Sequence, residues 1–448
     1  MKLSDQFRTG TLLKFALPSI LMMIFTSIYG VVDGFFVSNF GGKTAFAAVN
    51  FIMPVIMILI TPGYMIGSGG SALVAASMGE ESDEKARKQF TLLTVFAAVL
   101  GLIIALLSYL SINPLLHLLG CTAAMWHDAS LYAKILVPFM PFYLLQLFFQ
   151  SFFVTAEKPT YGFYVTLACG LTNMALDWVF VGVLGWGVAG AAWATNIGVI
   201  IGGLVPLLYF WKKRSSPLYF SKLKWNGKYI RKACLNGSSE MLTNVSMSLV
   251  GILYNWQLLH YIGENGVSAY GVLMYVNMIF SAIFMGFTMG TAPILSYNYG
   301  AGRKEELKKL LKRSACIILV SSLLMFAAAE VLGSPLSHMF VGYDPELVEL
   351  TSHAFHIYSF GFLFMGMAVY GSGFFTALND GVTSAVISFF RTLVFQVAAV
   401  IIFPILLGVD GIWMSIDFAE LSCFALVFLF LYLKRDYFGF ERKRTPSL

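Results

Sequence analysis

The chain has 448 residues, of which 58% are hydrophobic and 12% charged, with a mean hydropathy of +0.77 and a formal net charge of +6. This composition is too apolar for a soluble protein and indicates an integral membrane protein. The cysteines are scattered and odd in number, which suggests neither a disulfide framework nor a metal site.

Apolar stretches of at least about 20 residues recur along the chain, and each is long enough to cross a bilayer as a helix. We expect twelve crossings, at 12–38, 45–78, 89–111, 129–155, 161–184, 188–211, 232–260, 267–299, 311–333, 350–378, 382–407 and 411–434. The first stretch could pass for a signal peptide, but it is too long and lacks a small-residue cleavage site. It is therefore counted as helix 1.

The second half of the chain repeats the first at a constant offset of 221 residues. Matching pairs include Gly42 and Gly263, Gly69 and Gly290, Gly79 and Gly300, Pro114 and Pro335, His117 and His338, Phe153 and Phe374, Gly187 and Gly408, and Gly190 and Gly411. Because each half contains an even number of crossings, both insert in the same orientation. We predict an all-α membrane protein with twelve transmembrane helices in two six-helix lobes, related by a pseudo-twofold axis along the membrane normal.

The predicted units are an N-terminal lobe (1–211), a basic linker (212–231), a C-terminal lobe (232–434) and a tail (435–448). With the N-terminus inside, 26 of the 29 Lys and Arg residues fall on the cytoplasmic side. Only Lys43 lies outside, and Lys134 and Arg391 lie within helices. The positive-inside rule therefore predicts cytoplasmic termini and a bacterial-type inner membrane, and makes nucleic-acid binding unnecessary to explain the charge.

Three helices of the first lobe carry polar side chains at about one depth. Asp33 in helix 1, Asp177 in helix 5 and Thr195 in helix 6 each lie roughly 10 Å below the outer surface, at about 1.5 Å per residue. Asn173 lies one helical turn from Asp177, on the same face. Charges in the membrane normally face a cavity or a partner.

Carboxylate, amide and hydroxyl oxygens suit a hard cation such as Na⁺. Two buried carboxylates would also share a proton. The four residues are therefore a candidate coupling site, although the two acids could instead hydrogen-bond bent helices. The positions 221 residues later are Tyr254, Ala398 and Ile416, so the site is not duplicated. A purely architectural pair would more often be duplicated.

The remaining charges within the predicted spans give weaker signals. Glu240 and Arg391 lie at similar depth and could form an ion pair. Asp417 and Glu420 share a face of helix 12 and could form a second polar site. A substrate cavity could include Met22, Tyr29, Phe149, Phe153, Glu240, Asp417 and Glu420. Most aromatic residues are expected to pack against lipid or other helices instead.

At these residues the sequence resembles the multidrug and toxic compound extrusion (MATE) family. The resemblance rests on Leu17-Pro18, on Asp33, on the Asn173-x-x-x-Asp177 pattern and on the run 187–192 that leads to Thr195. It covers nearly the whole chain and is nearest to the bacterial drug-efflux and DinF-like branches. It implies that Asp33, Asn173, Asp177 and Thr195 form an N-lobe site for Na⁺ or H⁺.

The predicted function is therefore secondary active efflux, in which extracellular Na⁺ or H⁺ is exchanged for intracellular, mostly cationic compounds by alternating access. We expect no cofactor. The expected partners are membrane lipid and small organic molecules, and the protein is expected to be a monomer. Two alternatives stay open: a lipid-linked oligosaccharide flippase of the same superfamily and a narrow-specificity metabolite exporter. An enzyme is not expected, because the sequence has no nucleophile motif or phosphate-binding glycine loop.

Overall fold

The computed structural model describes residues 1–41, 43–212 and 216–435. Outside the described residues lie Gly42 of the repeat, 213–215 of the predicted linker and nearly all of the predicted tail. The described chain consists of helices and short connections and contains no strand.

The N-terminal lobe contains seven α-helices and three short segments of other helical type. Its elements are α1 (Thr9–Phe36), the π-helix η1 (Val37–Gly41), α2 (Lys43–Gly79), α3 (Asp83–Leu118), α4 (Ala123–Leu136), the 3₁₀-helix η2 (Val137–Phe139), α5 (Met140–Thr155), α6 (Pro159–Asp177), the π-helix η3 (Trp178–Val183) and α7 (Gly187–Trp211). Pro138 explains the break at η2, because proline removes a backbone donor and clashes with the preceding turn.

The C-terminal lobe follows the same plan. Its elements are α8 (Gly227–Tyr261), α9 (Glu264–Gly300), α10 (Lys304–Val341), α11 (Pro345–Tyr358), α12 (Gly361–Ala377), α13 (Gly381–Phe389), the π-helix η4 (Phe390–Gln396), α14 (Val397–Leu407) and α15 (Val409–Leu433). The repeat-equivalent glycines Gly187 and Gly408 lie at the start of the last helix of each lobe, with φ angles of 55° and 64°. This left-handed conformation favours glycine.

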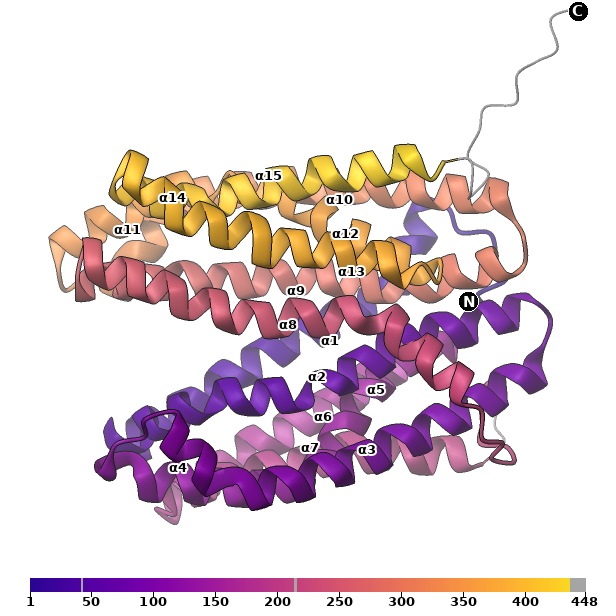
Figure 1. Cartoon of the computed structure of the whole chain (residues 1–448), viewed down its shortest axis with the longest axis horizontal. Helices are drawn as coiled ribbons and strands as arrows, with labels where there is room; N and C mark the ends of the chain where they lie inside the picture. The colour runs from indigo at the N-terminus through magenta and orange to yellow at the C-terminus, as the bar shows by residue number, and fades with distance from the viewer. Residues whose placement is uncertain (42, 213–215, 436–448) are drawn as a thin grey trace, which may run out of the picture.

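Within the described residues, ten helices are long and apolar enough to cross a membrane, and α11 with α12, bent by 50°, forms an eleventh candidate. The remaining predicted crossing corresponds to α8. Its 35 residues exceed the length needed to cross a bilayer, but Lys228, Arg231, Lys232 and Glu240 make it more polar than the others. Twelve crossings in two lobes therefore account for the helices (Figure 1).

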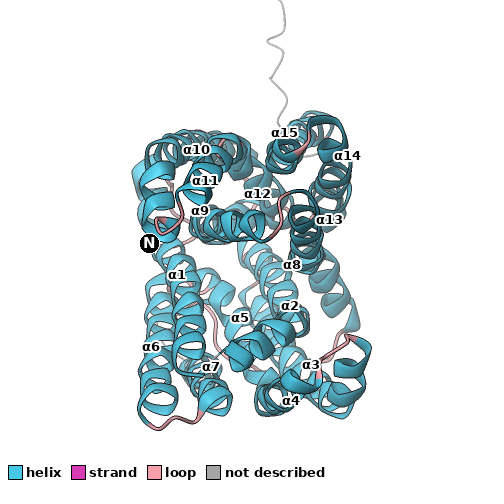
Figure 2. Ribbon diagram, turned by 90° about the vertical axis from the view of Figure 1, so that its left-hand side faces the viewer, coloured by secondary structure: helices cyan, strands magenta, loops and turns pink. Residues whose placement is uncertain are grey.

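The lobes meet through the first two helices of each repeat. Helix α1 packs on α9, and α2 packs on α8 and α9. Viewed along the helices, the remaining elements form two separate groups on either side of this contact (Figure 2). The two halves are therefore joined by a limited set of helices, as an internal duplication with a pseudo-twofold axis requires.

The buried hydrophobic residues form two clusters, and these make the two ends of the molecule different. One cluster joins the C-lobe to the half of the N-lobe that contains Phe15, Phe90 and Phe148. A second cluster, around Ile52, Tyr132 and Leu136, belongs to the N-lobe alone. The lobes thus share a core at one end only.

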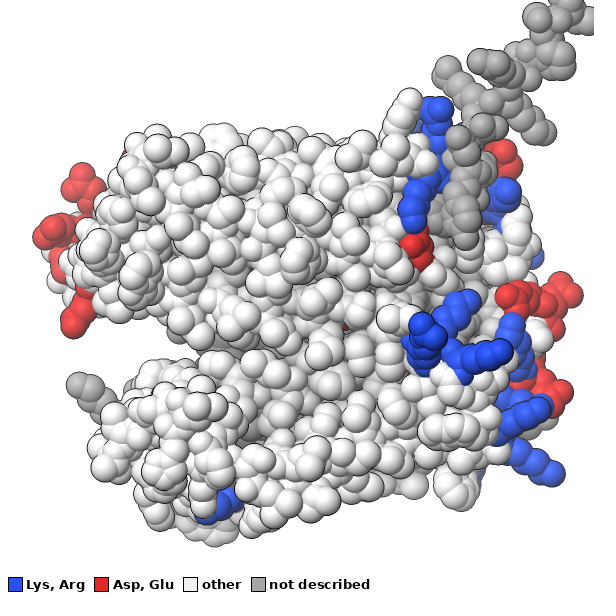
Figure 3. Space-filling model, viewed as in Figure 1, with Lys and Arg blue, Asp and Glu red and all other residues white. Residues whose placement is uncertain are grey.

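The surface shows which end this is. A wide apolar band covers the face seen in Figure 3, Lys and Arg side chains gather at the end near the N-terminus, and a notch separates the lobes at the opposite end. Exposed leucines such as Leu106 and Leu324, with exposed fractions of 63% and 65%, belong to this band. Such a surface fits contact with lipid.

Candidate functional site

The structure brings together the four polar residues of the first lobe. Asp33 comes from α1, Asn173 and Asp177 from the last turns of α6, and Thr195 from α7. Asp33 interacts with Asp177, Asn173 and Thr195. Equal depth on three neighbouring helices was thus enough to predict this cluster.

Hydrogen bonds define the arrangement around Thr195. Asn173 Nδ2 donates to Thr195 Oγ1 at 3.3 Å, and Thr195 Oγ1 donates to the carbonyl oxygen of Ala191 at 2.9 Å. The same hydroxyl lies 3.5 Å from Asp33 Oδ1. The oxygens of Asp33, Thr195 and Asp177 therefore converge on one small region between α1, α6 and α7.

The carboxylate of Asp177 is fully buried, and neither of its oxygens has a hydrogen-bond donor within the described chain. Asn173 Oδ1 is likewise buried without a partner there. Burying acceptors without donors is costly, and burying two facing carboxylates more so. A proton shared by the acids, or a cation coordinated by these oxygens, would remove the cost.

The π-helix η3 begins directly after Asp177. A π-helical turn inserts an extra residue into the helix, and such insertions are frequent at functional sites. The sequence contained no sign of this local distortion.

Two tyrosines near the acids were not predicted. Tyr132 in α4 and Tyr143 in α5 both interact electrostatically with Asp33. The hydroxyl of Tyr132 is buried and has no hydrogen-bond partner among the described residues. The available signal was a tyrosine within an apolar helix, where its hydroxyl needs a partner.

The aromatic residues proposed for the cavity lie in different surroundings. Tyr29 is half-buried and lies beside Gln146 and Asp33. Met22 is buried. Phe149 and Phe153 are buried in the aromatic cluster around Phe210 and border a space of only about 10 Å³. In this conformation that space is too small for an organic substrate.

In the second lobe, Arg391 pairs with Glu420 rather than with Glu240. Arg391 Nη2 donates to Glu420 Oε1 at 2.7 Å, and Arg391 Nε lies 3.0 and 3.1 Å from the two carboxylate oxygens. The expected pair with Glu240 is therefore corrected. Arg391 lies on η4, which packs directly against α15, and depth alone could not distinguish two acids on different neighbours.

The other two acids of this lobe have separate surroundings. Asp417 lies against Gly361, the first residue of α12, where a Cβ on the glycine would be 3.1 Å from Asp417 Oδ1. This oxygen is buried and has no hydrogen-bond partner among the described residues. Glu420 is an electrostatic neighbour of Asp417, and the second polar site expected on this face of α15 stays a prediction. Glu240 is partly exposed, and its electrostatic neighbours are Tyr64 of α2 and Arg391.

Comparison with known proteins agrees with this architecture. The MatE family model matches residues 18–179 and 241–402, one match in each half. The multidrug export protein MepA of Staphylococcus saprophyticus is 22% identical over 429 residues, covering 95% of this chain and 94% of that protein. MepA of Staphylococcus haemolyticus is 24% identical over 435 residues, with coverages of 95% and 93%.

The fold is also similar to solved structures. One is described as the outward-facing conformation of a multidrug resistance MATE family transporter of the MOP superfamily. It aligns with a TM-score of 0.91 and 21% identity, covering 97% of this chain and 98% of that chain. The two-lobe helical architecture is therefore confirmed. Since the family model covers most of both lobes, this multi-pass membrane protein belongs to the MatE family.

Proposed function

We propose that this protein exports small, mostly cationic organic molecules from the cell in exchange for Na⁺ or H⁺ that enters through the N-lobe site. Relatives named multidrug export proteins, aligned over nearly their whole length, support the export of drug-like compounds. The observation that carries the coupling proposal is the buried pair Asp33 and Asp177, in which neither oxygen of Asp177 has a hydrogen-bond donor among the described residues.

The orientation follows from charge. The end rich in Lys and Arg faces the cytoplasm by the positive-inside rule, so the notch between the lobes faces outward (Figure 3). In this state the shared core closes the cytoplasmic end. In the proposed cycle, this arrangement is the step at which substrate leaves and the coupling cation enters.

The proposed exchange follows from the repulsion between the two acids. A proton or Na⁺ that reaches the pair from outside neutralises it, and Asn173 and Thr195 supply further oxygens for Na⁺. Neutralisation lets α1, which carries Asp33, move closer to α6. Because α1 also packs on α9 of the other lobe, this movement can be transmitted across the interface.

Transport in everted membrane vesicles tests the proposal, because such vesicles expose the cytoplasmic face. Ethidium uptake is measured under an imposed Na⁺ gradient and, separately, an imposed H⁺ gradient. We expect one or both gradients to drive uptake by the wild type, and Asp33→Asn to abolish it. Glu330→Gln is the control. Glu330 lies in the part of α10 that is farther from the basic surface, where it pairs with His356.

Gradient-driven uptake that persists in both Asp33→Asn and Asp177→Asn would rule out coupling through this site. If the folded wild type moves no ethidium under either gradient, the narrow exporter or the flippase becomes the better account. A flippase for lipid pyrophosphates would need several cationic groups in its cavity, whereas the residues that line the C-lobe cavity include one basic side chain, Arg391.

A further inference from the structure

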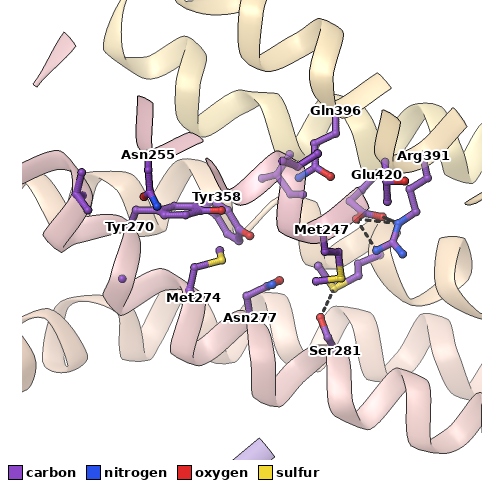
Figure 4. A pocket seen from close by; sticks show the side chains of 17 residues that line it. Met247, Asn255, Tyr270, Met274, Asn277, Ser281, Tyr358, Arg391, Gln396 and Glu420 are labelled. Carbon is purple, nitrogen blue, oxygen red and sulfur yellow. Dashed lines mark hydrogen bonds and ion pairs between the residues drawn. The ribbon is translucent and has the colours of Figure 1, made fainter. Parts of the chain in front are cut away.

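The C-lobe contains a cavity of about 410 Å³ that the proposed exchange does not use. Its walls come from α8, α9, α11, α12, η4 and α15, so it lies within this lobe rather than between the two. The volume falls within the range of small-molecule sites. Side chains labelled in Figure 4 converge on it, including Met247, Tyr270, Met274, Asn277 and Tyr358.

One end of the cavity holds an arginine with spare donors. Arg391 binds Glu420 through Nε and Nη2, at 2.7 to 3.1 Å. A guanidinium has five N–H donors, and Nη1 has no partner in the described chain. The Arg391 side chain is 16% exposed and lines the cavity, so this nitrogen can receive an anionic group without breaking the existing pair.

The cavity also holds an acceptor without a donor. Asn277 is 9% exposed, and its Oδ1 is buried with no hydrogen-bond partner among the described residues. An unsatisfied buried acceptor in a cavity wall is a place for a ligand's donor. The carboxylate of Glu420 lines the same cavity beside Arg391 and adds a negative charge there (Figure 4).

Comparison with the N-terminal repeat shows that the Arg391–Glu420 pair is specific to the C-lobe. The positions 221 residues before Arg391 and Glu420 are Gly170 and Val199. These lie on α6 and α7, the helices that carry Asp177 and Thr195. Each lobe thus places polar groups on its fifth and sixth crossings, but the chemistry differs: Asp177 and Thr195 in one lobe, Arg391 and Glu420 in the other.

We propose that this cavity binds a small aromatic zwitterion of the amino-acid type. Its carboxylate pairs with the free side of the Arg391 guanidinium, and its ammonium donates to Asn277 Oδ1 and Glu420. Its ring packs against Tyr270 and Tyr358 and the flexible side chains of Met247 and Met274. A ligand with both charges leaves the charge of this membrane-embedded site unchanged, whereas a cation or an anion does not.

Direct binding to the purified full-length protein tests this inference independently of the coupled exchange. The probes are tryptophan, tryptamine and N-acetyltryptophan, which share one ring and carry both charges, only the cation and only the anion. We expect tryptophan to bind at least about tenfold more tightly than either of the others, the difference expected from one charged hydrogen bond. Asp33→Asn leaves this order unchanged.

Two variants should test the carboxylate contact and the ammonium contact of the ligand separately. Arg391→Lys keeps the charge but loses the planar donor fork, so it weakens tryptophan and N-acetyltryptophan and spares tryptamine. Asn277→Leu leaves the ion pair intact and weakens tryptophan and tryptamine while sparing N-acetyltryptophan. Lys434→Gln, which removes a C-lobe ion pair with Asp380 away from the cavity, is the control and should have no effect.

A purely structural role for Arg391 would lower binding of all three probes together, through loss of fold. If Arg391→Lys does not fold, Asn277→Leu still decides the question. Equal affinity for the three probes, no saturable tryptophan binding by the folded wild type, or no change in either variant would each overturn the inference.

Discussion

At the scale of single residues, burial makes the Arg391–Glu420 pair the most sensitive polar contact of the C-lobe. The side chains are 16% and 3% exposed. Removing one partner leaves an uncompensated charge, so Arg391→Gln should lower the free energy of unfolding by about 3–5 kcal/mol. The double variant Arg391→Gln/Glu420→Gln should recover much of this loss, because neither charge remains. Thermal unfolding in detergent measures both.

The Lys434–Asp380 pair provides the comparison. Its side chains are 33% and 14% exposed, and it lies at the end of α15 near the basic surface. We expect Lys434→Gln to cost about 1 kcal/mol or less, because solvent screens a more exposed pair. Equal losses for Arg391→Gln and Lys434→Gln would show that burial does not set the strength of these contacts.

In the N-lobe, Thr195 allows the contribution of one oxygen to be measured. Thr195→Val keeps the shape and removes the hydroxyl that accepts from Asn173 and lies near Asp33. The concentration of coupling cation needed for half-maximal transport should rise roughly five- to tenfold, as loss of one hydrogen bond or ligand implies. Thr195→Ser, which keeps the oxygen, should stay near the wild type. Unchanged cation dependence in Thr195→Val would place the hydroxyl outside the site.

These residues also show why one site could be predicted and the other could not. Depth along a helix follows from residue number, since each residue adds about 1.5 Å, and this brought Asp33, Asp177 and Thr195 to one level. Depth does not say which helices are neighbours. Glu240 was the expected partner of Arg391, and only the packing of η4 against α15 brings Glu420 to it instead.

At the scale of elements, the N-terminal segment before α1 joins the two lobes at the basic end. The Leu3 amide donates to Glu157 Oε1 of the N-lobe at 2.7 Å. From the C-lobe, Arg313 Nη1 donates to the carbonyl oxygen of Phe7 at 2.5 Å. The side chains of Leu3 and Phe7 are 0% and 2% exposed. This N-terminal segment therefore holds the two lobes together at the closed end.

We expect Leu3→Asp/Phe7→Asp to undock this N-terminal segment from the two lobes. Each buried apolar side chain contributes about 1.5–3 kcal/mol, so the docked state should lose several kcal/mol. Cleavage by trypsin after Arg8 should then accelerate at least about tenfold, because it follows the population of the open form. Leu3→Met/Phe7→Met is the matched control and should cleave like the wild type. An unchanged cleavage rate in the Asp variant would mean that the docking does not depend on these side chains.

Only some of the boundaries between elements have a marker in the sequence. Pro138 is such a marker, and the chain breaks there into α4 and α5. The π-helices η3 and η4 had no such marker, although each lies at or beside a candidate site. Their extra residue is a response to tertiary packing, and no single side chain specifies it.

At the scale of the whole molecule, glycines let the lobes touch at the closed end, and the repeat relates their contacts. A Cβ on Gly69 would lie 2.1 Å from the carbonyl oxygen of Ala233, and one on Gly290 would lie 2.9 Å from the Cα of Ala16. Gly79 and Gly300 are repeat-equivalent, and a Cβ on either would lie 2.0 Å from a carbonyl oxygen of the opposite lobe. Backbone contact at four such points fits only the state closed at this end.

A side chain at Gly79 should therefore push the lobes apart at the basic end and close them at the other. Spin labels on cysteines at Leu118 and Tyr343, exposed residues at the notch end of α3 and α10, report this distance in a background without native cysteines. We expect Gly79→Val to shift the distance distribution to shorter values and to slow transport strongly, because one state of the cycle is lost. Gly30→Ala, where a Cβ meets nothing within 4 Å, should leave the distribution unchanged. A wild-type distribution in Gly79→Val would mean that the lobes adjust without rocking, since a contact of 2.0 Å cannot persist once a Cβ is added.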